Sequence, residues 1–331
     1  MSLATSAAEL AGPPPVIMLK DSFTDIGEFG RAAGWNLDFR QLEPGPLEAK
    51  VLVVGHPKIF FSRFTFNRGY HQLGKPPEGY WTFGIPDPDV GPFLWNGAET
   101  PDDVLINFSH EKGLDVVNPP GGSGGVVVSF DPEVLKRVRR DMGLPEDLLD
   151  RSRERRFSNP SPERSGQLRS LLLDMAAVAR TEGDAGLAHW SSVFNHDLAA
   201  LVLRSLAGPE LKPRMVLPLF RARALDRAVA LLASHEQMPS NVESLCHIAG
   251  ASWATLLRAF KESFGLSPKA YMKVRRLTAV REALLASDGK VRITDIANRW
   301  GFWHMGSFAA DYRRQFGELP SATRARLTSS D

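Results

Sequence analysis

A nine-residue segment near the C-terminus occurs twice. Phe260–Pro268 (FKESFGLSP) returns 52 residues later as Tyr312–Pro320 (YRRQFGELP). Upstream of these segments the similarity continues at an offset of 51, which pairs Gly250 with Gly301. The change of offset predicts one extra residue in the turn of the second copy. A repeat of this length constrains the fold strongly, because each copy must form the same supersecondary unit.

Each copy predicts two short helices joined by a tight turn. The first helix carries a small residue, Cys246 or Ala297, which lets a second helix cross closely. Glycine follows in both copies and accepts a positive φ at little cost. Apolar residues then recur four positions apart, as Leu256 and Phe260 do in the first copy. This is the helix-turn-helix plan, whose second helix enters the major groove of DNA.

Capping residues predict where these helices begin. Ser240 and Glu243 match a capping box before the first helix, and Ser252 is placed to cap the second. Ser267-Pro268 then opens a longer helix that runs to about residue 286 and joins the copies. At 1.5 Å per residue, about 20 residues span about 30 Å, close to one turn of B-DNA. One chain could therefore place two helices in successive major grooves.

The charge is distributed unevenly along the chain. Of 40 Lys+Arg and 38 Asp+Glu, 16 and 10 lie in residues 222–331, which leaves a net charge of +6 there and −4 in residues 1–221. A basic module on an acidic remainder is typical of nucleic-acid binding. The low overall charge of +2 argues against a sequence-blind architectural DNA-binding protein.

The second copy carries a recognisable set of motifs: Ile293-x-x-Ile-Ala, Trp300-Gly-Phe, Phe308 and Phe316-Gly-x-x-Pro320. In these the chain resembles the AraC/XylS family of bacterial transcription regulators. Trp300-Gly-Phe-Trp-His304 with Pro320-Ser321 is similar to the subgroup that includes ethanolamine-operon regulators. The resemblance implies double-stranded promoter DNA and RNA polymerase as partners and favours an activator. It also implies a homodimer and an N-terminal domain that senses a small-molecule effector.

The resemblance also places the DNA contacts of the first copy. Its reading helix starts at Ser252, with four groove-facing positions and one more a turn further on: Trp253, Ala254, Leu257, Arg258 and Lys261. Arg258 is the best candidate to read a base, because a guanidinium matches O6 and N7 of guanine. A phosphate contact is its alternative role. Arg275 and Arg276 on the joining helix either touch phosphates or face water.

The second reading helix offers few hydrogen bonds. Its exposed positions are predicted to be His304, Met305, Gly306, Ala309 and Ala310, and Ser307 stands where the subgroup has arginine. We therefore expect the second copy to read DNA shape and methyl groups, or to grip phosphate through Arg313 and Arg314. Sequence specificity should then reside mainly in the first copy.

Residues 16–155 predict a β-rich domain. Short β-branched or aromatic runs are separated by Gly, Pro and Asn, and they cover 50–54, 59–66, 80–85, 104–108 and 125–130. Such spacing is typical of a β-barrel or sandwich. The expected fold class is therefore α+β, with an antiparallel β-barrel or sandwich at the N-terminus, a helical linker and an all-α C-terminal domain. The family resemblance implies that the N-terminal domain is cupin-like. Five aromatic residues are either effector-pocket walls or plain core: Phe64, Phe66, Trp81, Phe83 and Trp95.

Two amphipathic helices are predicted between residues 162 and 207. They either cap the β-domain or pair between subunits. The expected organisation is a loose tail over residues 1–15, the β-domain over 16–155, this helical dimerisation or linker region over 156–215, and the DNA-binding domain over 216–331.

Other classes of function find little support in the sequence. The eight histidines are scattered and show no metal-binding pattern, so we expect neither a metal nor another cofactor. A DNA-binding enzyme that transfers alkyl groups would need a nucleophilic cysteine, but Cys246, the only thiol, falls on a packing position. One cysteine excludes an internal disulfide, and no apolar run reaches the ~18 residues that span a bilayer. We therefore expect a cytoplasmic protein that is not an enzyme.

Overall fold

The computed structural model describes most of the chain, with several gaps. The described residues are 16–24, 35–56, 58–101, 104–109, 113–158, 162–183, 196–208, 214–234, 238–239, 241–287 and 291–326. The tail predicted for residues 1–15 lies outside them.

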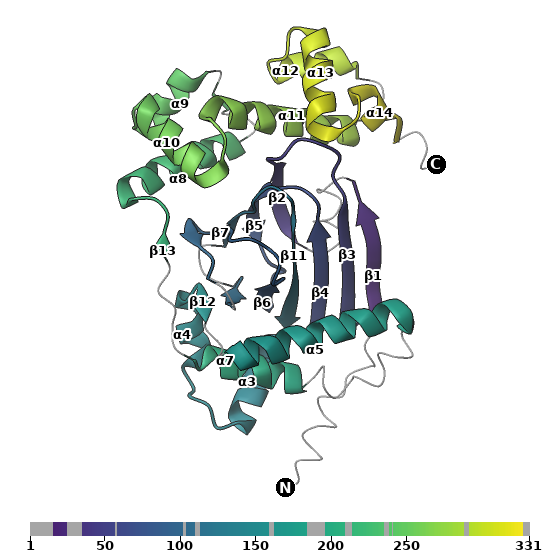
Figure 1. Ribbon diagram of the computed structural model, residues 1–331, viewed down its shortest axis with the longest axis vertical. Coiled ribbons are helices and arrows are strands. Elements are labelled where there is room, and N and C mark those ends of the chain that lie inside the picture. The colour runs from purple at the N-terminus through teal and green to yellow at the C-terminus, as the bar shows by residue number, and fades with distance from the viewer. Residues whose placement is uncertain are drawn as a thin grey trace.

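The N-terminal half forms two antiparallel sheets (Figure 1). The order of the seven-stranded sheet is β1 (Val16–Phe23), β3 (Ala49–His56), β4 (Ile59–Phe66), β11 (Ser123–Phe130), β6 (Trp81–Pro86), β9 (Leu105–Asn107) and β12 (Phe157–Ser158). The order of the six-stranded sheet is β13 (Arg214–Met215), β8 (Ala98–Glu99), β7 (Leu94–Trp95), β10 (Leu114–Val117), β5 (Tyr70–Lys75) and β2 (Asn36–Gln41). Side chains from both sheets share one core, so the domain is a sandwich and not a closed barrel.

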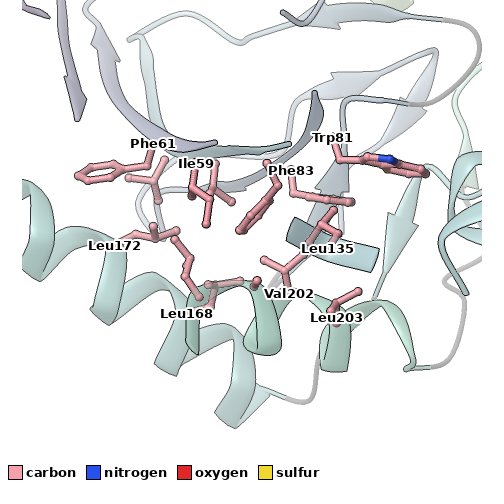
Figure 2. Packing of buried hydrophobic residues seen from close by; sticks show 14 of the residues in the cluster. Ile59, Phe61, Trp81, Phe83, Leu135, Leu168, Leu172, Val202 and Leu203 are labelled. Carbon is pink, nitrogen blue, oxygen red and sulfur yellow. The ribbon is translucent and has the colours of Figure 1, made fainter. Parts of the chain in front are cut away.

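The five predicted strands coincide with β3, β4, β6, β9 and β11. All five belong to the seven-stranded sheet. Four described helices accompany it: α3 (Pro132–Asp141), α4 (Leu148–Glu154), α5 (Pro162–Thr181) and α7 (Leu198–Leu206). Figure 2 shows side chains of α5 and α7 packed against residues of β4 and β6. The sheet therefore has helices on one face and the second sheet on the other.

The apolar stripe predicted for residues 162–207 caps the β-domain where the structure describes it. Leu168 and Leu172 of α5, and Val202 of α7, are buried in the core under the seven-stranded sheet. The second predicted helix also contains the apolar residues Leu187, Trp190 and Phe194, which lie outside the described residues.

The C-terminal part is entirely helical from residue 219 onward where it is described. Its helices are α8 (Leu219–Ala233), α9 (Val242–Ala249), α10 (Trp253–Phe264), α11 (Pro268–Ala286), α12 (Ile293–Arg299), α13 (Met305–Phe316) and α14 (Pro320–Ala325). Figure 1 shows α11 as a rod with α8, α9 and α10 at one end and α12, α13 and α14 at the other. The predicted pair of helix-turn-helix units joined by a long helix is therefore present. We call α8–α14 the DNA module.

The turn geometry explains the shift in the repeat offset. Gly250 (φ 60°) and Gly301 (φ 82°) both take the left-handed conformation that favours glycine. The N-cap of the next helix is Ser252, two residues after Gly250, in the first copy. In the second copy it is His304, three residues after Gly301, which makes no side-chain cap hydrogen bond. One cap differs from the prediction. The Asn241 side chain accepts a hydrogen bond from the Ser244 N–H, so the N-cap of α9 is Asn241 and not Ser240.

Candidate DNA-reading surface and sensor cavity

The first reading helix, α10, presents most of its predicted contact residues to solvent. Its N-terminus is fixed by Ser252, whose Oγ accepts the Thr255 N–H at 3.2 Å. Ala254, Arg258 and Lys261 are exposed, and Leu257 is half-buried. Trp253 is 45 % exposed, so part of its indole ring is open to a binding partner.

The opposite face of α10 is anchored in the module's core. Leu256, Ala259 and Phe260 are fully buried, together with residues of α8, α9 and α11. Burial of one face at helical spacing fixes the rotation of α10 about its axis. The face that carries Arg258 is therefore held outward.

The second reading helix, α13, presents smaller and less polar side chains near its N-terminus than α10 does. His304 is exposed, and Met305 is half-buried against the core that α11, α12 and α13 form. A side chain added at Gly306 would meet open space. Arg313 is exposed, whereas Arg314 already pairs with Asp311, one turn away on the same helix.

The two arginines of α11 predicted as candidate DNA contacts, Arg275 and Arg276, lie in different environments. Arg275 is 1 % exposed, and its Nε donates to the Leu232 carbonyl oxygen at 3.0 Å. It therefore ties α11 to α8 and is not on the DNA-reading surface. Arg276 is half-buried, its Nη2 donates to the Pro239 carbonyl oxygen at 3.0 Å, and burial lowers its pKa.

A buried polar cluster joins the DNA module to the six-stranded sheet. At its centre Tyr271 of α11 is fully buried, and its hydroxyl oxygen contacts Arg40 Nη1 of β2 and His71 Nδ1 of β5. Arg40 Nη2 donates to Asp38 Oδ2 at 2.6 Å, and His71 Nε2 lies 2.9 Å from Asp115 Oδ1 of β10. We call these five residues the Tyr271 junction.

Protonation states in the junction follow from its geometry. Burial raises the pKa of Tyr271 to about 12, so the phenol keeps its proton at neutral pH. Because Arg40 can only donate, the phenol proton is left to point at His71 Nδ1. In the tautomer that accepts at Nδ1, the Nε2–H of His71 donates a hydrogen bond to Asp115 Oδ1. Burial alone would raise the pKa of Asp38, but the Arg40 guanidinium holds that pKa below its ordinary value.

A second contact holds the other end of the module. Gln315 of α13 donates from Nε2 to the Gln41 carbonyl oxygen at 2.7 Å, and Gln41 Nε2 reaches the Gln315 carbonyl oxygen at 3.1 Å. Both side chains are buried. The module is thus fixed to the six-stranded sheet through Tyr271 of α11 and Gln315 of α13.

A cavity of about 60 Å³ lies between the two sheets. It brings together three of the five predicted pocket aromatics, Phe64, Phe66 and Trp95. Trp81 and Phe83 are not among its lining residues. They face the helices on the far side of the seven-stranded sheet, as Figure 2 shows.

Strand alternation explains this division. Phe83 pairs with Val128, which in turn pairs with Phe61, and all three belong to the helix-backed core. Phe64 pairs with Gly125 on the opposite face, toward the second sheet. The sequence shows the period of two but not which face of each strand meets the helices.

Within the described residues, no helix is long and apolar enough to cross a membrane, and no group of three or more His, Cys, Asp or Glu could hold a metal ion. Cys246 is half-buried on α9, and burial raises the pKa of its thiol.

Residues 245–326 match a family model described as a helix-turn-helix domain. Over 95 residues the chain is 38 % identical to a probable thc operon regulatory protein of Rhodococcus erythropolis, covering 28 % of this chain and 29 % of the relative. It is 37 % identical over 101 residues to the XylDLEGF operon transcriptional activator of Pseudomonas putida, covering 30 % and 32 %. The chain thus spans about a third of the length of these curated relatives.

Among solved structures, a probable AraC family transcriptional regulator from Rhodopseudomonas palustris is 35 % identical to this chain. The match covers 31 % of this chain and 95 % of that structure, at a TM-score of 0.29.

Proposed function

Because its C-terminal module belongs to the AraC/XylS family, we propose that this chain is a sequence-specific, promoter-binding transcription regulator. The observation that carries the proposal is the pair of helix-turn-helix units at the two ends of α11, each with an exposed second helix. The 19 residues of α11 give a length of about 28 Å at 1.5 Å per residue, near the ~34 Å of one turn of B-DNA. Two neighbouring major grooves on one DNA face fit this spacing.

The chemistry of the two reading helices supports different roles for them. Arg258 projects from α10 as a donor able to bind guanine bidentately. Trp253, the first residue of the same helix, can pack on a thymine methyl or a sugar. The exposed part of α13 offers His304 and an open glycine, with Arg313 free to reach a phosphate. Base readout is therefore assigned to α10, and shape readout and backbone grip to α13.

The sandwich is proposed to be the sensor, and the Tyr271 junction to be its connection to the module. Strands β2, β5 and β10 present alternate residues to opposite sides. Leu37, Gln72 and Val116 line the cavity, whereas their neighbours Asp38, His71 and Asp115 belong to the junction. A ligand that displaces these strands changes how the module is held, and hence how it meets DNA.

The partners of this regulator are inferred from the family. We propose a homodimer that contacts RNA polymerase at a promoter and responds to a small-molecule effector, acting as an activator. The ethanolamine-operon subgroup is supported only by the Trp300–His304 motif with Pro320-Ser321 and stays a prediction. Since promoter DNA lies in the bacterial cytoplasm, the proposal places the chain there.

Two other classes of function are less consistent with these features. An alkyl-transferring DNA-binding enzyme needs a reactive thiolate, but the raised pKa of Cys246 and its packing position on α9 disfavour one. A sequence-blind architectural binder has no need of the exposed Arg258 and Trp253.

Selection of bound duplexes from a random DNA library tests the proposal. A regulator enriches one motif and binds it about 10³-fold or more tightly than scrambled duplex at physiological salt. Failure to enrich any motif, with equal binding of all duplexes, would leave the architectural class as the better description.

A further inference from the structure

The walls of the sandwich cavity are apolar with a few neutral polar groups. The described residues that line it include Ser62, Gln72 and Asn118, and none of them carries a charged side chain. The nearest ion pair to Gly124 in the wall is Arg63–Asp87, whose charged atoms lie 2.8 Å apart. These two charges already neutralise each other, so a charged ligand would enter without a counter-ion and would lose its hydration.

One hydrogen-bond donor in this wall lacks an acceptor. Trp95 is 1 % exposed, and its indole Nε1–H is buried without a hydrogen-bond partner in the described part of the chain. Buried N–H groups are nearly always bonded, so this donor is available to an acceptor atom that a molecule in the cavity supplies.

The size of the cavity limits what can supply that acceptor. A water needs about 10–15 Å³ of such space, so 60 Å³ admits only a few water-sized groups, about as many as one small ring holds. We infer that the cavity binds an uncharged, largely apolar molecule of about one ring, whose oxygen accepts the Trp95 Nε1–H bond. The inference rests on the proposed sensor role for its regulatory meaning, but not for the binding itself.

Three cyclohexane derivatives of similar size separate the chemical classes. Cyclohexanone is neutral with an acceptor, methylcyclohexane has no acceptor, and cyclohexanecarboxylate is an anion. Each is titrated into the full chain while the indole N–H signals are followed by ¹⁵N NMR, with the Trp95 signal assigned from Trp95→Phe. Cyclohexanone should shift the Trp95 signal, and its affinity should depend on the Trp95 N–H, whereas that of methylcyclohexane should not. Cyclohexanecarboxylate should bind most weakly.

Matched variants identify the site. Trp95→Phe should weaken the binding of cyclohexanone about three- to tenfold, as loss of one neutral hydrogen bond allows, and leave methylcyclohexane unaffected. Trp303→Phe, the same change at a side chain that is 71 % exposed, should affect neither. Val90→Trp, at a half-buried position in the cavity wall, should block all three molecules.

Two results would overturn the inference: tightest binding of the carboxylate, or a Trp95 signal unmoved by cyclohexanone up to its solubility limit. Affinity for the selected duplex is measured on the same samples. Wild-type chain that binds this duplex but fails the ligand test refutes only the ligand class, whereas loss of specific DNA binding refutes the proposed function.

Discussion

Removal of one oxygen atom, in Tyr271→Phe, should loosen the DNA module from the sensor while leaving both folded. The hydroxyl of Tyr271 links Arg40 of β2 to His71 of β5, and both of these side chains are fully buried. Phenylalanine keeps the ring contacts with Phe260 and Phe264 inside the module. The substitution therefore acts on the interface between the domains more than on either core.

The magnitude follows from the groups left without partners. Arg40 Nε already lacks a hydrogen-bond partner among the described residues, and the variant removes the partner of Nη1 as well. Loss of a hydrogen bond to a buried charged group costs about 1.5–3 kcal/mol. The ratio of docked to undocked module should therefore fall by about 10- to 150-fold.

Electron paramagnetic resonance distance measurements report this equilibrium directly. Spin labels are placed at Lys136→Cys on α3 and Arg299→Cys on α12, in a Cys246→Ala background. The distance distribution should broaden in Tyr271→Phe. Tyr312→Phe is the matched control, because the described partners of that buried hydroxyl, Thr323 Oγ1 at 2.8 Å and Arg281, both belong to the module. Equal broadening in both variants, or in neither, would refute the role of the Tyr271 junction.

Three further predictions test other parts of the account. In binding assays on variant duplexes, Arg258→Ala should relax base preference, whereas Arg313→Ala should weaken all sequences and reduce the salt slope by about 1; equal, sequence-blind losses would contradict the division of roles. The Asp38–Arg40 pair should survive mild acid, because the lowered pKa of Asp38 keeps the carboxylate charged until the pH falls below the ordinary value of 3.8. Asp38→Asn should weaken docking of the module at neutral pH and flatten the dependence of docking on acid pH. If the same distance measurement gave an unchanged dependence on pH in this variant, that result would count against the pair. Gly306→Ala should stabilise the DNA-free chain by about 0.5–1 kcal/mol in thermal unfolding, since open space surrounds the site; a lower stability would contradict the helical conformation assigned to this residue.

The repeat made the DNA module predictable from the sequence. Helix and turn residues, the extra residue after Gly301 and the caps at Ser252 and Ser267 all arise from local chemistry, which a sequence displays directly. The exposed positions on α10 follow from the same helical period. Arg275 shows the limit of such reasoning, because only the packing of α11 against α8 reveals that this arginine is buried.

The sensor was less predictable, and for a physical reason. Strand β2 (NLDFRQ) alternates apolar with polar residues, a pattern that usually means a face in water. Here the polar face of β2 is buried against the DNA module, where Arg40 of β2 and His71 of β5 meet Tyr271. The sequence separates these residues by more than 190 positions, so nothing local pairs them.

Hydroxyl-radical footprinting of the full chain on its selected duplex tests the central claim most directly. Two helix-turn-helix units at the ends of α11 should protect two patches on one face of the DNA, about one helical turn apart. Arg258→Ala should weaken protection of the patch read by α10 more than that of the other. A single continuous patch, or protection that is the same on a scrambled duplex, would contradict the account.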